Sequence, residues 1–149
     1  MILYLILLTL HAFSILFDEF YFHKKRGLPL WERMGHPFDT LTVLFCVGLL
    51  IFFPTHLSIT PIYTGLAIFS CLVVTKDEFI HQSHCDAKEQ WLHAILFILH
   101  PVVLWIYYQF WLEGKFFWLN IIFSILCIHM MYQLVYWNLF QKNRKGSLL

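Results

Sequence analysis

The chain has 149 residues, of which 60% are hydrophobic, 19% are aromatic and only 13% are charged, and its formal net charge is +1. This composition lies well outside the range of soluble globular domains and excludes a separate water-soluble domain. Because one crossing of a bilayer takes about 20 apolar residues, the length allows about four to six spans. We therefore expect an all-α fold, a polytopic membrane helical bundle in a single domain.

The apolar segments predict five helices in chain order. The first is expected from about Ile2 to His23 as a retained span rather than a signal peptide, and the second begins near Pro37, a favoured first helical position. Thr60 and Pro61 begin the third helix, which runs on into an acidic and histidine-rich segment. Asp86 begins the fourth, which ends at about residue 112, and the fifth covers about 116–140, before a basic tail at 141–149.

The positively charged residues predict the orientation of the chain. Nine of the ten Lys and Arg residues fall in the first loop, in the connection between the third and fourth helices and in the tail, whereas Lys115 stands alone on the other side. Cytoplasmic loops carry the excess of such residues, so the N-terminus is expected outside and the C-terminus in the cytoplasm. The run from Lys24 to Arg26 is expected to set topology and contact anionic lipid, not nucleic acid.

The chain also contains an internal repeat. Asp-Glu-Phe occurs at residues 18–20 and again at 77–79, and each copy is followed by a Glu-x-x-x-His and an apolar span. Repeat one covers about 1–54 and repeat two about 59–112, so two hairpins of the same orientation would form a four-helix bundle around a polar site on the cytoplasmic side. The sequence leaves open whether the fifth helix joins this bundle or forms a partner interface.

Histidines and carboxylates gather at the predicted cytoplasmic helix ends. At 100° per residue, Asp77, Glu78, His81 and His84 share an arc of about 120° on one helix, and Glu19 and His23 are neighbours on another. Helical bundles build dinuclear metal sites from such inward-facing Glu and His groups. Asp18 and Asp77 are expected to orient imidazoles from behind. The predicted metal ligands are Glu19, His23, Glu32, His36, Glu78, His81, His84, Glu89 and His93.

Two of these predictions have simpler alternatives. Glu89 follows Asp86 at capping-box spacing and could simply cap the fourth helix. Glu32 and His36 enclose Gly35 and precede Pro37, which disfavours helical geometry, so His36 would bind from a turn.

Three further histidines fall inside the predicted spans at a similar depth. His11 and Asp18 lie seven residues apart on one helix, and His93 and His100 lie seven apart on another. His11, His100 and His129 could form a second site, because ionisable groups at this depth are costly and tend to be functional. Alternatively, each hydrogen-bonds a neighbouring helix, or His100 bonds a carbonyl freed by Pro101.

Imidazole and carboxylate ligands together suit iron, manganese or zinc, and the ligand set is large enough for two ions. The motif HQSH at His81 to His84 resembles the integral-membrane diiron enzymes of the fatty-acid hydroxylase and desaturase type, although their HxxxH and HxxHH boxes are absent here. The acid content is similar to that of the carboxylate-bridged bundle proteins related to ferritin and hemerythrin. The resemblance implies a diiron oxidoreductase that acts on a lipid or other hydrophobic substrate and takes electrons from a cytoplasmic donor.

Three other functions stay open at this point. A zinc ion at the same site would activate water and make the protein a membrane hydrolase. His11, His100 and His129 could instead hold haem in an electron carrier. The same three histidines could form the path of a metal or proton permease, with the cytoplasmic cluster as its entrance.

Overall fold

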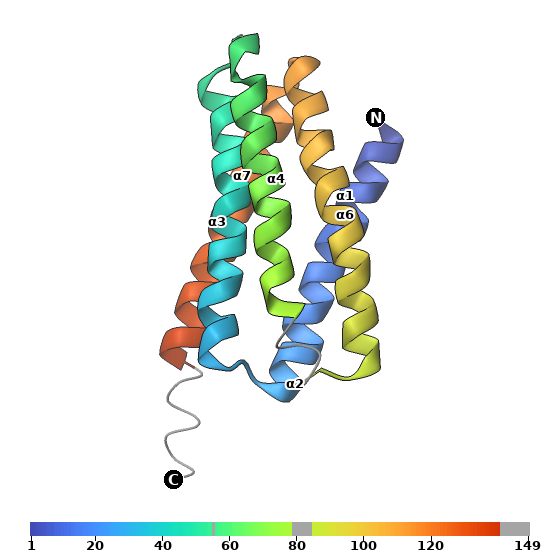
Figure 1. The fold of residues 1–149 in the computed structure, drawn as a ribbon, viewed down its shortest axis with the longest axis vertical. Helices are drawn as coiled ribbons and strands as arrows, with labels where there is room; N and C mark the ends of the chain where they lie inside the picture. The colour runs from blue at the N-terminus through green and yellow to red at the C-terminus, as the bar shows by residue number, and fades with distance from the viewer. Residues whose placement is uncertain (55, 79–84, 141–149) are drawn as a thin grey trace.

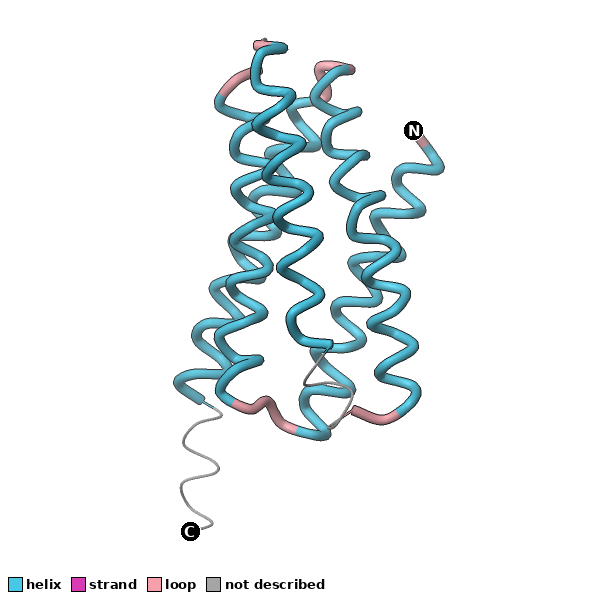
Figure 2. Tube along the Cα trace, viewed as in Figure 1, coloured by secondary structure: helices cyan, strands magenta, loops and turns pink. Residues whose placement is uncertain are grey.

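The computed structural model describes residues 1–54, 56–78 and 85–140 (Figure 1). The described residues are helices joined by short turns, without a strand (Figure 2). The helices are α1 (Ile2–Phe17), a π-helical turn (Asp18–His23), α2 (Lys24–Arg26), α3 (Leu30–Phe52), α4 (Thr60–Val74), α6 (Ala87–Leu112) and α7 (Phe116–Val135), which ends in a second π-helical turn (Tyr136–Phe140). Short 3₁₀ turns (Leu57–Ile59 and Thr75–Asp77) flank α4.

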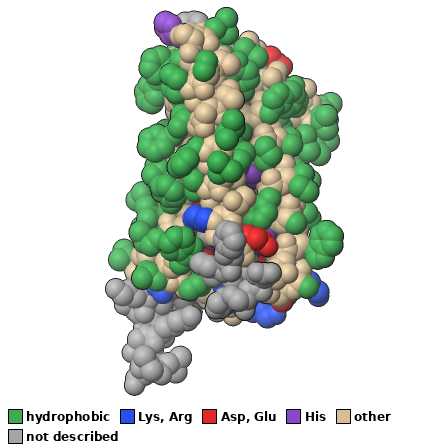
Figure 3. Space-filling view, in the orientation of Figure 1, with side chains coloured by type: hydrophobic (Ala, Val, Ile, Leu, Met, Phe, Trp, Pro, Cys, Tyr) green, Lys and Arg blue, Asp and Glu red, His purple; other side chains and the backbone are tan. Residues whose placement is uncertain are grey.

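Five of these helical segments are long and apolar enough to cross a membrane. Many large hydrophobic side chains lie on their outer surfaces, where a soluble protein would carry polar groups (Figure 3). The five segments are Ile2–Arg26, Leu30–Phe52, Leu57–Val74, Ala87–Leu112 and Phe116–Phe140. The predicted number of spans is therefore found as five helices of suitable length and composition.

The apolar core lies toward the end of the bundle away from α2. Val47 and Leu50 of α3, Ile106 and Phe110 of α6 and Leu119 of α7 are fully buried there. Interhelical hydrogen bonds accompany this packing, since Tyr63 Oη donates to the Leu104 carbonyl at 2.6 Å and Trp111 Nε1 donates to that of Phe53 at 3.1 Å. The apolar core therefore fixes the helices and leaves the α2 end for polar side chains.

One boundary differs clearly from the sequence prediction. The second helix was expected to begin near Pro37, but α3 begins at Leu30, directly after Pro29, and continues through Pro37. The residue before a proline usually avoids helical geometry, but His36 is helical here. The contact of Arg26 with Glu32, in the first turn of α3, helps to hold the helix in place on the N-terminal side of Pro37. Glu32 and His36 thus lie on a helix rather than in a turn.

A short turn joins α2 to α3. Gly27 has φ +76° and ψ 159°, a conformation that favours glycine, and its backbone N–H donates to the His23 carbonyl at 2.7 Å. The chain therefore reverses within Gly27, Leu28 and Pro29. This reversal places the end of the first helical segment beside the start of α3, which is where the polar side chains meet.

Candidate metal centre

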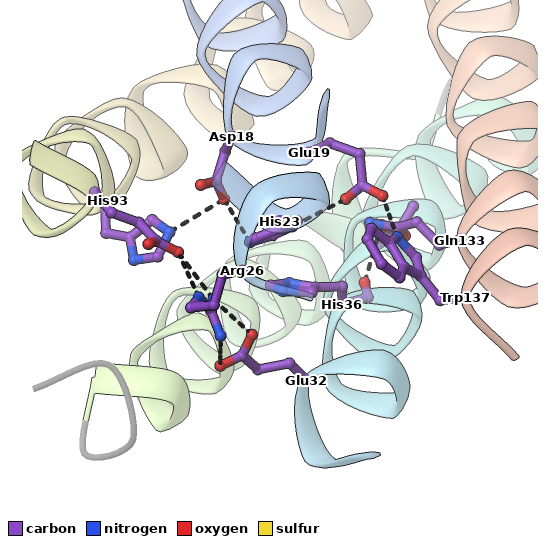
Figure 4. Close-up of polar contacts among 11 residues, drawn as sticks. Asp18, Glu19, His23, Arg26, Glu32, His36, His93, Gln133 and Trp137 are labelled. Carbon is purple, nitrogen blue, oxygen red and sulfur yellow. Dashed lines mark hydrogen bonds and ion pairs between the residues drawn. The ribbon is translucent and has the colours of Figure 1, made fainter. Parts of the chain in front are cut away.

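A buried polar cluster lies at the α2 end of the bundle (Figure 4). It combines side chains from the last turns of the first helical segment, the first turns of α3 and α6, and the end of α7. The acidic, basic and imidazole members are Asp18, Glu19, His23, Arg26, Glu32, His36, Glu89 and His93.

Four of these side chains form a group that could hold a metal ion. Asp18, His23, Glu89 and His93 each offer a donor atom, and these atoms all lie within 4.8 Å of one another. All four residues are buried, with exposed fractions of 5% or less. The group joins the π-helical turn to the first two turns of α6, so it links segments about 70 residues apart in the chain.

Asp18 is central to this group. His93 Nε2 donates to Asp18 Oδ2 at 3.1 Å, and His23 Nε2 lies 3.1 Å from the same oxygen. The other carboxylate oxygen, Oδ1, is buried and accepts no hydrogen bond from the described residues. A buried carboxylate oxygen that lacks a donor is costly, and a cation in the group would satisfy it.

A second, adjacent group consists of His23, Glu32 and His36. The rings of His23 and His36 stack with centroids 4.8 Å apart at 29°. Because His23 belongs to both groups, the two potential ion positions would be neighbours. The structure therefore brings together predicted ligands of the first helix, α3 and α6.

The π-helical turn explains why Asp18 reaches His23. In an α-helix, residues five apart point about 140° away from each other, so Asp18 would face elsewhere. A π-helix pairs residue i with residue i+5, and such turns are frequent at functional sites. Both Asp18 and Glu19 therefore approach the His23 ring, at 3.1 and 3.3 Å.

Glu19 lies behind His23. Glu19 Oε2 accepts from His23 Nδ1 at 3.3 Å, and Glu19 Oε1 accepts a hydrogen bond from Trp137 Nε1 of the last helix. A carboxylate in this position fixes the tautomer and orientation of a metal-binding imidazole. Glu19 was expected to be a ligand, but it lies in the position of a carboxylate that orients an imidazole. Asp18 was expected to orient an imidazole, but it belongs to the four-residue donor group.

Arg26 belongs to the cluster but was not predicted as a site residue from the sequence. Its guanidinium forms a two-pronged contact with Glu32, at 3.1 and 2.8 Å, and a further contact with Glu89 Oε1 at 2.8 Å. In the sequence Arg26 is one of three consecutive basic residues, a pattern that indicates membrane topology. Arg26 follows His23 by three residues, and residues at this spacing lie on the same face of a helix. This spacing is the signal in the sequence that Arg26, of the three basic residues, faces inward.

The charges of the cluster indicate room for a cation. Asp18, Glu19, Glu32 and Glu89 are 5% exposed or less, and together they bring four negative charges. Arg26 supplies one positive charge, to Glu32 and Glu89. A buried negative charge needs a positive partner. Protonated imidazoles or a metal ion would provide the positive charge that neutralises Asp18.

The first turn of α6 settles the alternative for Glu89. Asp86 is the N-cap, and its Oδ1 accepts from the backbone N–H groups of Lys88 at 2.9 Å and Glu89 at 3.0 Å. These bonds, first that from Glu89, lower the pKa of the Asp86 carboxyl. The Glu89 side chain points inward to Arg26. Asp86 thus caps the helix, and Glu89 is available to the buried cluster.

The rest of the predicted ligand set falls between α4 and α6 in the sequence. Glu78, which directly follows the 3₁₀ turn Thr75–Asp77, is exposed. His81, His84 and the side chain of Asp77 lie outside the described residues, so their assignment as ligands stays a prediction.

The histidines inside the spans occupy two places. His100 Nε2 lies 2.9 Å from Ser70 Oγ, which lies 2.7 Å from Thr42 Oγ1, and the His11 ring centroid is 6.1 Å from that of His100. His129 on α7 instead stacks on Tyr132 at 6.4 Å. The Ser70 hydroxyl, rather than a carbonyl freed by Pro101, is therefore the partner of His100.

Comparison with protein-family models, curated proteins and solved structures found no match for this chain.

Proposed function

We propose that the chain is an integral membrane metalloenzyme whose metal centre is built on Asp18, His23, Glu89 and His93. In this proposal the five helices cross the membrane with the N-terminus outside, and the centre lies near the cytoplasmic face. The convergence of four buried donor atoms within 4.8 Å is the observation that carries it.

The chemistry of the donors suits a transition-metal ion. Two imidazoles and two carboxylates are ligands that iron, manganese and zinc share. Ligands bonded at 2.0–2.1 Å in a tetrahedron would lie about 3.4 Å from one another. The Nε2 atoms of His23 and His93 already lie 3.1 Å from Asp18 Oδ2, so small outward shifts would admit an ion.

We propose that the metal is iron and that each chain binds two ions, the second of them at His23, Glu32 and His36. A bound iron centre would supply oxygen-dependent redox chemistry directed at a C–H bond of a lipid or another hydrophobic substrate. Glu19 holds the His23 ring by its far nitrogen, and Arg26 keeps Glu32 and Glu89 in fixed positions. A cytoplasmic protein would donate the electrons.

The two predicted hairpins are part of this proposal. The first hairpin, α1 to α3, contributes Asp18, His23, Glu32 and His36, and the second, α4 to α6, contributes Glu89 and His93. Trp137 and Gln133 support the inclusion of the last helix, because Trp137 donates to Glu19 and Gln133 accepts from Thr40 of α3 at 2.9 Å.

Metal analysis of the purified full chain tests the proposal. After loading with iron, zinc or manganese, the wild-type protein is expected to retain at least one ion per chain. Asp18→Asn, which keeps the size of the side chain and removes its charge, is expected to retain less than one. Glu113→Gln is the matched control, because Glu113 is an exposed carboxylate next to Lys115, beyond the last turn of α6.

Two results would contradict the proposal. One is less than one retained ion per wild-type chain with each of the three metals. The other is equal retention by the wild type and Asp18→Asn. An optical spectrum of the same sample also tests the haem alternative, since bound haem gives an intense Soret band.

A zinc hydrolase is the second candidate, and the number of donors in the first group favours it. Four nitrogen and oxygen donors match the usual four-coordinate geometry of zinc. Zinc bound in preference to iron, together with the absence of redox activity, would favour hydrolysis of a lipid ester or amide over oxidation.

A further inference from the structure

The seam between α1 and α6 carries pairs of polar side chains at regular intervals. The two helices run in opposite directions and pack side by side (Figure 1). Asp18 and His93 meet across the seam at 3.1 Å, and His11 and His100 meet with ring centroids 6.1 Å apart. His11 precedes Asp18 by seven residues, and His100 follows His93 by seven, so the second pair lies two helical turns from the first.

The same interval leads to a third polar residue of α1 that contacts α6. Seven residues before His11 is Tyr4, whose ring packs on Trp105 and Phe110 of α6 with centroid distances of 5.7 and 5.9 Å. The carboxylate of Asp18, the imidazole of His11 and the phenol of Tyr4 all form hydrogen bonds along which a proton can pass.

Asp18, His11 and Tyr4 extend over much of a membrane. Successive residues of this series are about 10.5 Å apart along the helix axis, so the series covers about 21 Å of a hydrocarbon core that is about 30 Å thick. The series therefore reaches from the polar cluster at the α2 end well into the bundle.

One set of hydrogen-bond directions satisfies all the contacts around His100. With the Thr42 hydroxyl donating to the Asp39 carbonyl at 2.7 Å, Ser70 donates to Thr42 at 2.7 Å and accepts from His100 Nε2 at 2.9 Å. In this arrangement His100 carries a proton on Nε2 and has its lone pair on Nδ1, where it can bind another proton.

Interhelical hydrogen bonding alone accounts for Ser70 and Thr42, but not for His11. Polar side chains in a membrane bundle commonly bond across helices. His11 faces the seam from α1 with its ring beside that of His100, and ionisable side chains at this depth typically mark paths for protons or ions. Ser70 and Thr42 are uncharged, so they orient His100 without neutralising a charge on it.

We propose that the α1–α6 seam conducts protons across the bundle, with His11 and His100 as the proton-binding pair at mid-depth. A proton would bind to the Nδ1 lone pair of His100 or to His11, form an imidazolium, and leave from this pair along the seam. In this proposal, water that enters the seam would bridge the intervals of about 10.5 Å. This function is independent of the identity of the metal and does not require that one binds.

Proton flux in liposomes tests this inference. The full chain is reconstituted with an enclosed pH-sensitive dye, and a potassium gradient with valinomycin drives protons inward. The wild-type protein is expected to acidify the lumen faster than protein-free vesicles do. His100→Gln is expected to abolish the difference, because the amide still donates to Ser70 but cannot bind a proton.

Two further variants separate conduction from folding. His11→Gln is expected to lose flux as His100→Gln does. His129→Gln is the matched control, since His129 is also inside a span but lies on α7 beside Tyr132, and this variant is expected to keep wild-type flux. Retention time on a sizing column checks that each variant is folded.

A wild-type rate no higher than that of protein-free vesicles would overturn the inference, as would equal rates for the wild type and a folded His100→Gln. Metal content is measured in the same preparations. Metal retention without flux would leave the proposed metalloenzyme and remove proton conduction, whereas flux without metal would do the reverse.

Discussion

His23 connects the two donor groups of the cluster. It belongs to both of them, its Nδ1 donates to Glu19, and its Nε2 lies 3.1 Å from Asp18. The His36 ring stacks on it, which leaves His23 only 1% exposed. The geometry of both candidate ion positions therefore depends on this one imidazole.

Arg26 gives a prediction about stability at the residue scale. Arg26→Met removes the guanidinium and leaves Glu32, which is fully buried, and Glu89 without it. Removal of one partner of a buried ion pair costs roughly 3–5 kcal/mol, and we expect about 3 kcal/mol here because Arg26 is partly exposed. Unfolding in mixed detergent micelles measures the change.

Lys25→Met is the matched control, because Lys25 precedes Arg26 and is exposed. This variant is expected to unfold within about 0.5 kcal/mol of the wild type. Equal stabilities for Arg26→Met and Lys25→Met would show that Arg26 does not hold the two carboxylates.

Much of the cluster could be predicted from residue types alone. Histidines and acids at the ends of apolar spans are costly and tend to be functional, which predicted Glu32, Glu89 and His93 as ligands. The structure places all three in the buried cluster, and their binding of a metal stays a prediction. The inward turn of Arg26 could not be foreseen, because a basic run beside a span has a sufficient explanation in topology. The division of roles between Asp18 and Glu19 depends on a local helix geometry that residue types do not encode.

At the scale of the element, the π-helical turn is the main departure from a regular pattern. A wheel drawn at 100° per residue places Glu19 beside His23 and Asp18 elsewhere, whereas the π-helical turn brings both to the same ring. The heptad from Tyr4 through His11 to Asp18 is kept because the change of pitch begins only at Asp18.

Helix boundaries were predictable where capping residues mark them. Asp86 caps α6 as predicted. Thr60 was predicted to cap the next earlier helix, but Ile59 is the N-cap of α4, and Thr60 is its first residue, with Pro61 in the first turn. The start predicted for α3 at Pro37 was wrong, because the helix already begins at Leu30 and continues through Pro37. A proline is favoured in the first turn of a helix, but this preference does not prevent earlier residues from being helical. The true start follows Pro29, which is the N-cap, and Glu32 in the first turn is held by Arg26, six residues before it.

The cap of α6 gives a prediction about pH at this scale. The Glu89 N–H donates to Asp86 and lowers the pKa of its carboxyl from the ordinary 3.8. A lowered pKa in the folded state means that the ionised carboxylate stabilises the fold above pH 3.8, and that this contribution is lost as the pH falls through the lower folded value.

Asp86→Asn is the matched variant, since its amide oxygen still accepts the two N–H bonds but does not titrate. At neutral pH the wild type is expected to unfold at a slightly higher temperature than Asp86→Asn, because only the wild-type cap carries the charge. Near pH 3 the wild type is expected to lose more stability than Asp86→Asn does. An equal loss in both proteins would contradict the role of the Asp86 charge in the cap.

At the scale of the whole molecule, the five helices separate two environments. An apolar core fills the end away from α2, and the buried charged cluster lies at the α2 end. The turns and helix ends beside that cluster also carry most of the basic residues, including Lys24, Lys25, Lys76 and Lys88. The proposed orientation therefore places the metal centre on the cytoplasmic side.

Cysteine labelling tests this orientation. In a background from which the four native cysteines are removed, Lys115→Cys is expected to react with a membrane-impermeant maleimide on intact cells. Lys25→Cys is expected to react only after the membrane is opened, because it lies at the opposite end of the bundle. The reverse pattern would place the cluster on the outer face.

The bond from Trp137 to Glu19 has a practical consequence. This indole is 1% exposed and connects through a single carboxylate to the ring that both donor groups share. We therefore expect the fluorescence of Trp137 to change when that ring shifts, and Trp137→Phe would identify its part of the emission. Trp137 would thus serve as an intrinsic fluorescent probe. Its emission could be recorded while a cation is added, without a chemical label.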